Sequence, residues 1–235
     1  MKKVDIKSII QFEPQEVLSP AQRDKSKAFL INSLRKAVFD WRNKNYPKTT
    51  KTTKMLLEFW FREDHAKNDE KFQFWFAQRE AIESLIYIYE VLGKRRFVDL
   101  ASDFGEGSFK YDPKIDKYPL YCFKMATGSG KTFVMAMAIV WSYFNYKREN
   151  KDDYTSKFLI ISPNMIVYER LKRDFAEGGI FEDWPFIPSE WKQNFRLKVI
   201  LRKDPLQSVL GDVLFLTNIQ QLEERRTKKK NIFTR

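Results

Sequence analysis

The sequence predicts an α/β fold with a mostly parallel sheet, preceded by a small helical N-terminal segment. Short apolar runs rich in β-branched residues alternate with helical patterns after residue 71, which is the order of strands and crossover helices in a parallel sheet. In addition, "FKMATGSGKTF" (residues 123–133) places two glycines, a lysine and a threonine between an apolar run and a helical pattern.

Residues 1–70 are predicted to form the helical segment. A helix is expected to begin at Ser19 and Pro20, because serine caps a helix and proline suits its first turn. Its apolar residues recur at helical spacing: Leu30, Leu34, Val38 and Trp41. Residues 43–54 are then predicted as a polar, basic connector, residues 55–61 as a short helix, and residues 62–71 as a charged loop.

Residues 71–235 are predicted to form the α/β domain. The pattern of residues 77–93 predicts a helix that ends at Gly93, and the glycine, aspartate and proline content of residues 101–119 predicts a loop. The other elements alternate: strands at residues 120–125, 158–162, 196–201 and 213–217, and helices at residues 132–148 and 164–176.

The glycine-rich stretch predicts a nucleotide-binding loop. Small residues allow consecutive backbone N–H groups to point inward, and the following helix adds a partial positive charge at its start. Lys131 is expected to reach the β- and γ-phosphates, and Thr132 to offer its hydroxyl to Mg²⁺. The loop residues expected to hold the nucleotide are Thr127, Gly128, Ser129, Gly130, Lys131 and Thr132. The alternative is a glycine turn that joins a strand to a helix and binds nothing.

The loop departs from the general G-x-x-x-x-G-K-S/T pattern at Met125, where that pattern has glycine. "ATGSGKT" instead resembles motif I of superfamily 2 helicases and translocases, with matches at Ala126, Gly128, Gly130, Lys131 and Thr132. This resemblance implies a RecA-like core with ATP and Mg²⁺ as cofactors. It points to nucleic-acid motors rather than to kinases or small GTPases.

A glutamine ahead of motif I reads the adenine edge in superfamily 2 proteins, and "FAQREAIESL" resembles that pattern. By this resemblance Gln78 is expected to contact adenine, because a side-chain amide donates and accepts at once. Four nearby aromatic side chains belong either to the core or to a base-stacking platform: Phe72, Phe74, Trp75 and Phe76.

Two later strand ends resemble turns that contact nucleic acid. "FLIISPNMIVYERLKRDF" resembles motif Ia, and "LFLTNIQQL" resembles the Thr-Asn stretch of type III restriction res subunits. The resemblance implies that these residues hold the phosphates of one strand: Ser162, Pro163, Asn164, Thr217 and Asn218. Ordinary strand-end turns are the alternative. As a set, the four motifs look like the first motor lobe of a type III restriction enzyme res subunit, over roughly residues 70–222.

The acidic Asp-Glu-x-x motif of such a motor does not follow. Glu223 and Glu224 have no apolar strand and no aspartate before them, and the second lobe with its arginine finger is also missing. We therefore expect a first lobe that is truncated before the Asp-Glu-x-x motif. Such a fragment is expected to bind ATP weakly and to hydrolyse it negligibly alone.

Composition indicates a polyanionic partner. Lys and Arg number 43 against 31 Asp and Glu, a formal charge of +12, which attracts nucleic acid or else only maintains solubility. The run 225–230, "RRTKKK", is either a solvated loop or a nucleic-acid contact.

The single Cys122 excludes an internal disulfide, and we expect structural roles for Cys122 and His65. No signal peptide is visible, and the longest apolar run, residues 133–141, is too short to span a membrane. A cytoplasmic location without membrane contact is expected.

The leading hypothesis is the ATP-binding lobe of a DNA-dependent ATPase that translocates on or unwinds duplex DNA in restriction or phage defence. Its expected partners are duplex DNA, its own second motor lobe and a modification (methyltransferase) subunit. One alternative is a nucleotide-dependent DNA- or protein-binding module without hydrolysis. Another is a different superfamily 2 translocase, for repair or remodelling.

Overall fold

The computed structural model describes residues 29–105, 112–114, 116–177, 179–201 and 211–220. The chain forms two compact units. The first combines the described part of Met1–Lys54 with Gln73–Val134, and the second combines Met55–Phe72 with the described part of Met135–Arg235. Helices α5 (Lys51–Arg62) and α8 (Lys131–Arg148) contribute residues to both units.

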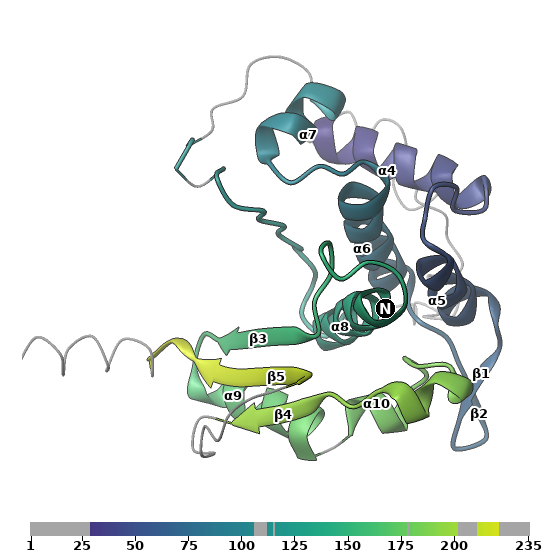
Figure 1. Cartoon of the computed structure of the whole chain (residues 1–235), viewed down its shortest axis with the longest axis vertical. Helices are drawn as coiled ribbons and strands as arrows, with labels where there is room; N and C mark the ends of the chain where they lie inside the picture. The colour runs from purple at the N-terminus through teal and green to yellow at the C-terminus, as the bar shows by residue number, and fades with distance from the viewer. Residues whose placement is uncertain (1–28, 106–111, 115, 178, 202–210, 221–235) are drawn as a thin grey trace, which may run out of the picture. The chain divides into compact units, whose positions relative to one another are not determined.

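The first unit is helical. It contains α4 (Phe29–Asn43), α6 (Phe76–Ile86), the π-helical turn η1 (Tyr87–Val91) and α7 (Phe97–Phe104). The apolar face predicted for the first helix is confirmed, because Leu34, Val38 and Trp41 are buried and α4 packs against α6 and α7 (Figure 1). The predicted end of the second helix is also confirmed, since Gly93 has φ 63° after η1.

A buried charge network joins α4 to α6. Glu83 is fully buried, and its carboxylate accepts hydrogen bonds from Arg42 Nε at 2.9 Å, Arg79 Nε at 2.9 Å and the Tyr46 hydroxyl at 2.6 Å. Burial, together with the Glu83 charge, holds the Tyr46 pKa well above its usual range. Because a buried carboxylate is stable only when it is paired, these bonds hold α6 against α4.

The second unit contains the predicted parallel sheet. Its strands β3 (Lys157–Ser162), β5 (Val213–Asn218) and β4 (Lys198–Leu201) pair in parallel in the order β3-β5-β4, so their arrows point the same way in Figure 1. Ser162 lies opposite Asn218 at the carboxyl edge, and Lys198 lies opposite Val213 near the amino edge. Because the strands run parallel, the polar ends of β3 and β5 lie side by side.

Helices and aromatic side chains complete the second unit. After β3 come α9 (Met165–Lys172), the π-helical turn η2 (Arg173–Glu177), α10 (Ile180–Asp183) and the 3₁₀ turn η3 (Ser189–Asn194). α9 packs on β3 and β5. Phe144 contacts Trp191 with ring centroids 4.9 Å apart, and the Trp60 indole of α5 donates to the Phe186 carbonyl at 2.8 Å.

Three predicted loop boundaries are wrong. The charged loop is a hairpin of β1 (His65–Lys67) and β2 (Glu70–Phe72), because Asn68 and Asp69 adopt the positive φ angles of a two-residue turn. Helix α5 begins inside the predicted connector, at Lys51, and α7 continues through residue 104 into the predicted loop.

The strand predicted at residues 120–125 is also wrong, because residues 119–126 have no regular secondary structure. A strand needs a neighbour for its backbone hydrogen bonds. Within the described residues, no strand pairs with this segment, and Leu120 remains 67% exposed. The predictions for Ser19 and Pro20, for Glu223 and Glu224 and for residues 225–230 lie outside the described residues. The domain boundary at residue 70 stays a prediction.

Candidate functional site

The glycine-rich stretch forms a loop that closes directly onto helix α8. Gly128 and Gly130 have φ angles of 81° and 84°, a region in which a β-carbon is strained. The Ser129 N–H and hydroxyl both donate to the Ala126 carbonyl, at 3.3 and 2.7 Å. In the described part of the chain, no carbonyl accepts from the N–H groups of Thr127, Gly128 or Gly130. The loop therefore keeps backbone donors available beside a helix start.

Lys131 is the first residue of α8, and its side chain crosses back over the loop. The ammonium donates to the Met125 and Ala126 carbonyls, both at 2.8 Å. Lys131 is nevertheless exposed, and Thr132 beside it is half-buried. The predicted lysine and threonine thus stand together at the start of α8, where the loop ends, and the lysine ammonium folds back onto loop carbonyls.

Gln78 lies against this loop. Its amide Nε2 donates to the Ser129 carbonyl at 3.2 Å, and its Oε1 accepts from the Trp75 N–H at 2.9 Å. A β-carbon on Gly130 would lie 2.1 Å from Gln78 Nε2, so the glycine is needed for this contact. Gln78 is only 5% exposed. The side chain that sequence reasoning linked to adenine therefore packs on the glycine-rich loop and holds it at Ser129.

The four aromatic side chains near Gln78 occupy different environments. Phe74 is buried and meets Phe133 edge-on at 6.2 Å, and Phe72 packs against Trp184 in the second unit. Trp75 is the most exposed of them, with 41% of its surface accessible one helical turn before Gln78. Among these residues, Trp75 is therefore the ring that is most accessible from solvent. Composition alone could not separate it from its buried neighbours.

The predicted nucleic-acid residues meet at the carboxyl edge of the sheet. Ser162 ends β3 and Asn218 ends β5, and Pro163 and Asn164 form the turn into α9. Asn164 caps that helix, since its side-chain oxygen accepts from the Val167 N–H at 2.9 Å. Pro163 and Asn164 are exposed, so the turn presents a helix start and short polar groups at the surface.

Two of these predicted residues are buried. Ser162 is 1% and Asn218 is 0% exposed; the Ser162 hydroxyl donates to the Asn164 carbonyl at 3.1 Å, and the Asn218 amide donates to the Met165 sulfur. Their side chains therefore stabilise the turn between β3 and α9 through hydrogen bonds to Asn164 and Met165. Pro163 and Asn164 are the exposed residues of this predicted set, and Thr217 is half-buried.

The candidate residues form two groups, one in each unit. Gln78 and the phosphate loop belong to the first unit, and the turns after β3 and at the end of β5 belong to the second. Among the described residues, no three histidine, cysteine or acidic side chains gather as a metal site. A Mg²⁺ ion bound with nucleotide needs few protein ligands, because phosphates and waters fill most of its octahedron. The single Thr132 hydroxyl fits that requirement.

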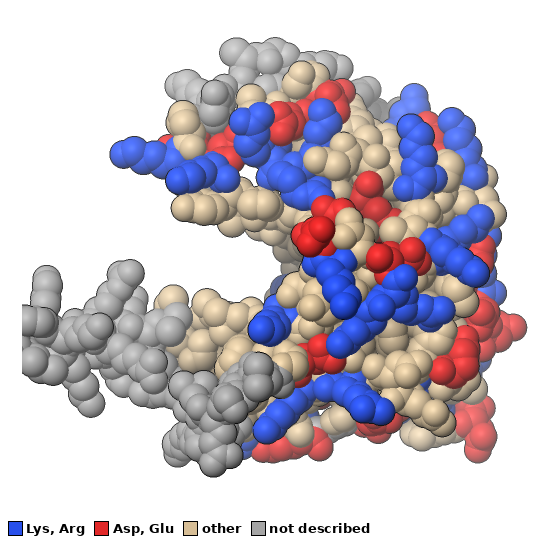
Figure 2. All heavy atoms as spheres, viewed as in Figure 1, with Lys and Arg blue, Asp and Glu red and all other residues tan. Residues whose placement is uncertain are grey.

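The remaining sequence expectations concern charge and structural residues. Lysine and arginine side chains lie among acidic ones on the face drawn in Figure 2, so net charge alone does not locate a binding surface. His65 has a structural contact, since its Nε2 lies 2.7 Å from the Phe59 carbonyl, and Cys122 is exposed. Within the described ranges, no helix has both the length and the apolar character to span a membrane.

Comparison with known proteins gives one match. Residues 71–234 match the family model described as "Type III restriction enzyme, res subunit", which covers more than half of the chain. No curated protein and no solved structure matches the sequence.

Proposed function

Because the chain belongs to the family of type III restriction enzyme res subunits, whose domain is helicase superfamily 2-like, we propose that it is the ATP-binding lobe of a DNA-dependent translocase. The observation that carries this proposal is the loop at Gly128–Lys131, with two left-handed glycines, available backbone donors and a lysine at the start of α8. Proteins of this family are in general helicase- or ATPase-type hydrolases that use ATP and Mg²⁺ and act on DNA.

In this proposal the loop binds the triphosphate. The N–H groups of Thr127, Gly128 and Gly130 donate to phosphate oxygens, with the partial charge of the α8 start behind them. Lys131 exchanges its bonds to the Met125 and Ala126 carbonyls for the β- and γ-phosphates. The carbonyl contacts hold the lysine close to the loop, so little reorganisation is needed when a phosphate arrives.

Gln78 and Trp75 are proposed to recognise the base. Trp75 stacks on the adenine, and Gln78 uses the amide hydrogen that remains after its bond to Ser129. Thr132 is proposed to hold Mg²⁺, which when bound neutralises charge on the β- and γ-phosphates. The chain's own contribution is to bind and orient the nucleotide.

DNA is proposed to contact the carboxyl edge of the sheet, at Pro163, Asn164 and Thr217, with Ser162 and Asn218 fixing the turns beneath. Hydrolysis is proposed to require an Asp-Glu-x-x motif and a second motor lobe in addition to these residues. A modification subunit and a role in phage defence belong to the same proposal. Each ATP cycle would then shift the bound strand relative to the lobe.

The first experiment is calorimetric titration with a non-hydrolysable ATP analogue and Mg²⁺. Lys131→Ala is expected to weaken binding about 10- to 100-fold, since a charge-assisted bond is lost. The matched control is Lys124→Ala, an exposed lysine ahead of the loop, which should bind within about two-fold of the unmodified chain. Unchanged affinity in Lys131→Ala would remove the basis for the nucleotide site.

A second measurement tests the need for further catalytic residues. The chain is expected to show no ATP turnover above background, with or without duplex DNA, although it binds the analogue. Steady turnover that Lys131→Ala abolishes would show instead that the present residues suffice for hydrolysis.

A further inference from the structure

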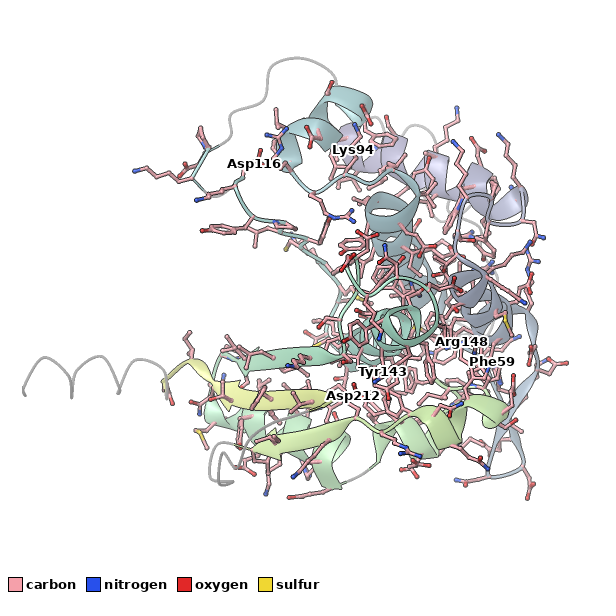
Figure 3. The ribbon with its side chains drawn as sticks, in the orientation of Figure 1. Phe59, Lys94, Asp116, Tyr143, Arg148 and Asp212 are labelled. Atoms are coloured by element: carbon pink, nitrogen blue, oxygen red, sulfur yellow. The ribbon has the colours of Figure 1, made fainter. Side chains whose placement is uncertain are left out.

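A polar pocket of about 590 Å³ opens in the second unit at the amino edge of the sheet. Its residues come from the end of α8, from η3, from the segment before β4 and from the residue before β5. Six of them carry the argument: Tyr143, Lys147, Arg148, Trp191, Arg196 and Asp212. Figure 3 labels Tyr143, Arg148 and Asp212, with the Tyr143 and Asp212 side chains beside each other. Pockets of this size hold small molecules or single chemical groups of larger ligands.

Tyr143, Asp212 and Lys147 form a hydrogen-bond network at the base of the pocket, which we call the floor. The Tyr143 hydroxyl lies 2.9 Å from the Asn194 carbonyl and 3.0 Å from Asp212 Oδ2, and it accepts from the Arg196 N–H at 3.0 Å. The other Asp212 oxygen pairs with the Lys147 ammonium at 2.7 Å. Both oxygens of this carboxylate are thus engaged, and its charge is matched by one lysine.

The protonation states of the floor are fixed near neutral pH. Burial raises the pKa of Tyr143 to about 12, and the hydrogen bond to Asp212 adds to the shift. Burial by itself would raise the pKa of Asp212, but the hydrogen bonds from Lys147, Ser156 and Tyr143 outweigh it and lower the pKa. Tyr143 is therefore neutral and Asp212 ionised, so the floor carries no net charge once Lys147 is included.

Two arginines, Arg148 and Arg196, also line the pocket. Arg148 lies 4.0 Å from the ring centroid of Trp191, which is itself buried against Phe144. Arg196 is held at its backbone by the bond to Tyr143. Both arginines are exposed, and no carboxylate of the described residues pairs with either. Guanidiniums without a paired carboxylate suit a tetrahedral oxyanion, because their donors match phosphate oxygens in pairs.

One acidic side chain competes for these arginines. Glu190 lines the same pocket and is exposed, and its carboxylate contacts only the Ser189 hydroxyl, at 3.4 Å, within the part of the chain that the structure describes. It lies more than salt-bridge distance from both guanidiniums. Its negative charge therefore lowers the affinity of the pocket for an anion without filling the pocket.

We propose that this pocket is a second phosphate-binding site, in which Arg148 and Arg196 clamp one phosphate group. The six residues of β5 separate it by roughly 20 Å from the turn at Asn218. It is therefore a separate site from the DNA-contacting edge proposed above. The phosphate belongs either to a nucleic-acid backbone or to a small phosphorylated molecule, and the site does not depend on the ATP-binding proposal.

The direct test is a pyrophosphate titration followed by calorimetry in a Lys131→Ala background, which removes the lysine of the phosphate loop. Arg148→Gln with Arg196→Gln is expected to weaken pyrophosphate binding about 10- to 100-fold. The control Arg62→Gln removes a single positive charge from a surface pair with Glu58 and should leave binding unchanged. Equal affinity in the Arg148/Arg196 variant and its parent would overturn the proposal.

A variant that is expected to bind pyrophosphate more tightly gives a second test, because misfolding of the arginine variants could weaken binding but could not explain a gain. Glu190→Gln removes the competing charge and is expected to tighten pyrophosphate binding about two- to five-fold. Unchanged or weaker binding in Glu190→Gln would count against an anion site here, whatever the arginine variants show.

The source of the phosphate is decided with a duplex DNA oligonucleotide, by fluorescence anisotropy at several salt concentrations. If the backbone occupies the pocket, the double arginine variant should reduce the magnitude of the slope of log K against log salt by about 1, because the two arginines clamp one phosphate. An unchanged slope, together with arginine-dependent pyrophosphate binding, assigns the pocket to a small phosphorylated molecule. DNA binding that is lost only on substitution of Asn164 would support the proposed function and leave the pocket to the pyrophosphate result.

Discussion

Alanine at Gly130 should damage the nucleotide loop more than alanine at Gly128. The two glycines have nearly the same backbone angle, 84° and 81°, but their surroundings differ. A β-carbon at Gly130 would lie 2.1 Å from Gln78 Nε2, whereas a β-carbon at Gly128 meets no atom of the described residues within 4 Å. Gly128→Ala is therefore a control for the cost of the backbone angle alone.

The magnitudes follow from two contributions. An alanine held in the left-handed region costs about 1 to 2 kcal/mol, and both variants incur this cost. In Gly130→Ala the β-carbon also displaces the Gln78 amide from the Ser129 carbonyl, at a further cost of about 1 kcal/mol. The free energy of unfolding should therefore fall by about 1 to 2 kcal/mol in Gly128→Ala and by about 2 to 3 kcal/mol in Gly130→Ala.

The assay is urea denaturation followed by circular dichroism, together with titration of the ATP analogue. A double-mutant cycle adds Gln78→Ala, which removes the displaced amide and opens the space that the new methyl group needs. Gly130→Ala should then cost about 1 kcal/mol less than it does when Gln78 is present. Equal losses in the two glycine variants, or no coupling to Gln78, would refute the role of Gln78 as a brace for the loop.

Three further predictions concern other contacts. Glu83→Ala leaves the buried Arg42 and the half-buried Arg79 without their carboxylate and should lower the free energy of unfolding by about 3 to 5 kcal/mol in urea denaturation. Glu58→Ala breaks an exposed pair and serves as its control, with an expected loss below about 1 kcal/mol. Because the folded-state pKa of Asp212 is lowered, its stabilisation is complete above an unfolded pKa of about 3.9 and is lost as the pH falls through the folded pKa. The gap in urea midpoint between the unmodified chain and Asp212→Asn should therefore be widest near neutral pH and close in acid; a constant gap would contradict this. Trp75→Ala should weaken ATP-analogue binding about 5- to 30-fold and leave tripolyphosphate binding unchanged, and an equal loss for both ligands would exclude stacking on the base.

The sequence alone predicted the elements whose patterns are local and strong. The apolar face of α4, the long helix α8 after the loop and the three parallel strands depend on spacing and on β-branched content, which fix secondary structure with little outside help. The loop itself was predictable because few residue types fit left-handed positions beside a helix start. Gly128 and Gly130 occupy those positions.

Tertiary structure decided the features that depend on partners. Residues 119–126 carry an apolar pattern but form no strand among the described residues, because a strand exists only with a neighbour to bond. The hairpin of β1 and β2 replaced a predicted loop, since strand pairing and the contact of Phe72 with Trp184 outweigh its charged composition.

The same division holds for the candidate site. Residue types and order in the sequence predicted a phosphate loop, a role for Gln78 and two strand-end turns that contact nucleic acid. Only the folded chain shows that Gln78 packs on Gly130, that Ser162 and Asn218 are buried, and that Arg148 and Arg196 line a pocket at the other edge of the sheet. Burial and the meeting of distant side chains depend on how elements pack in three dimensions, and spacing along the chain does not encode them.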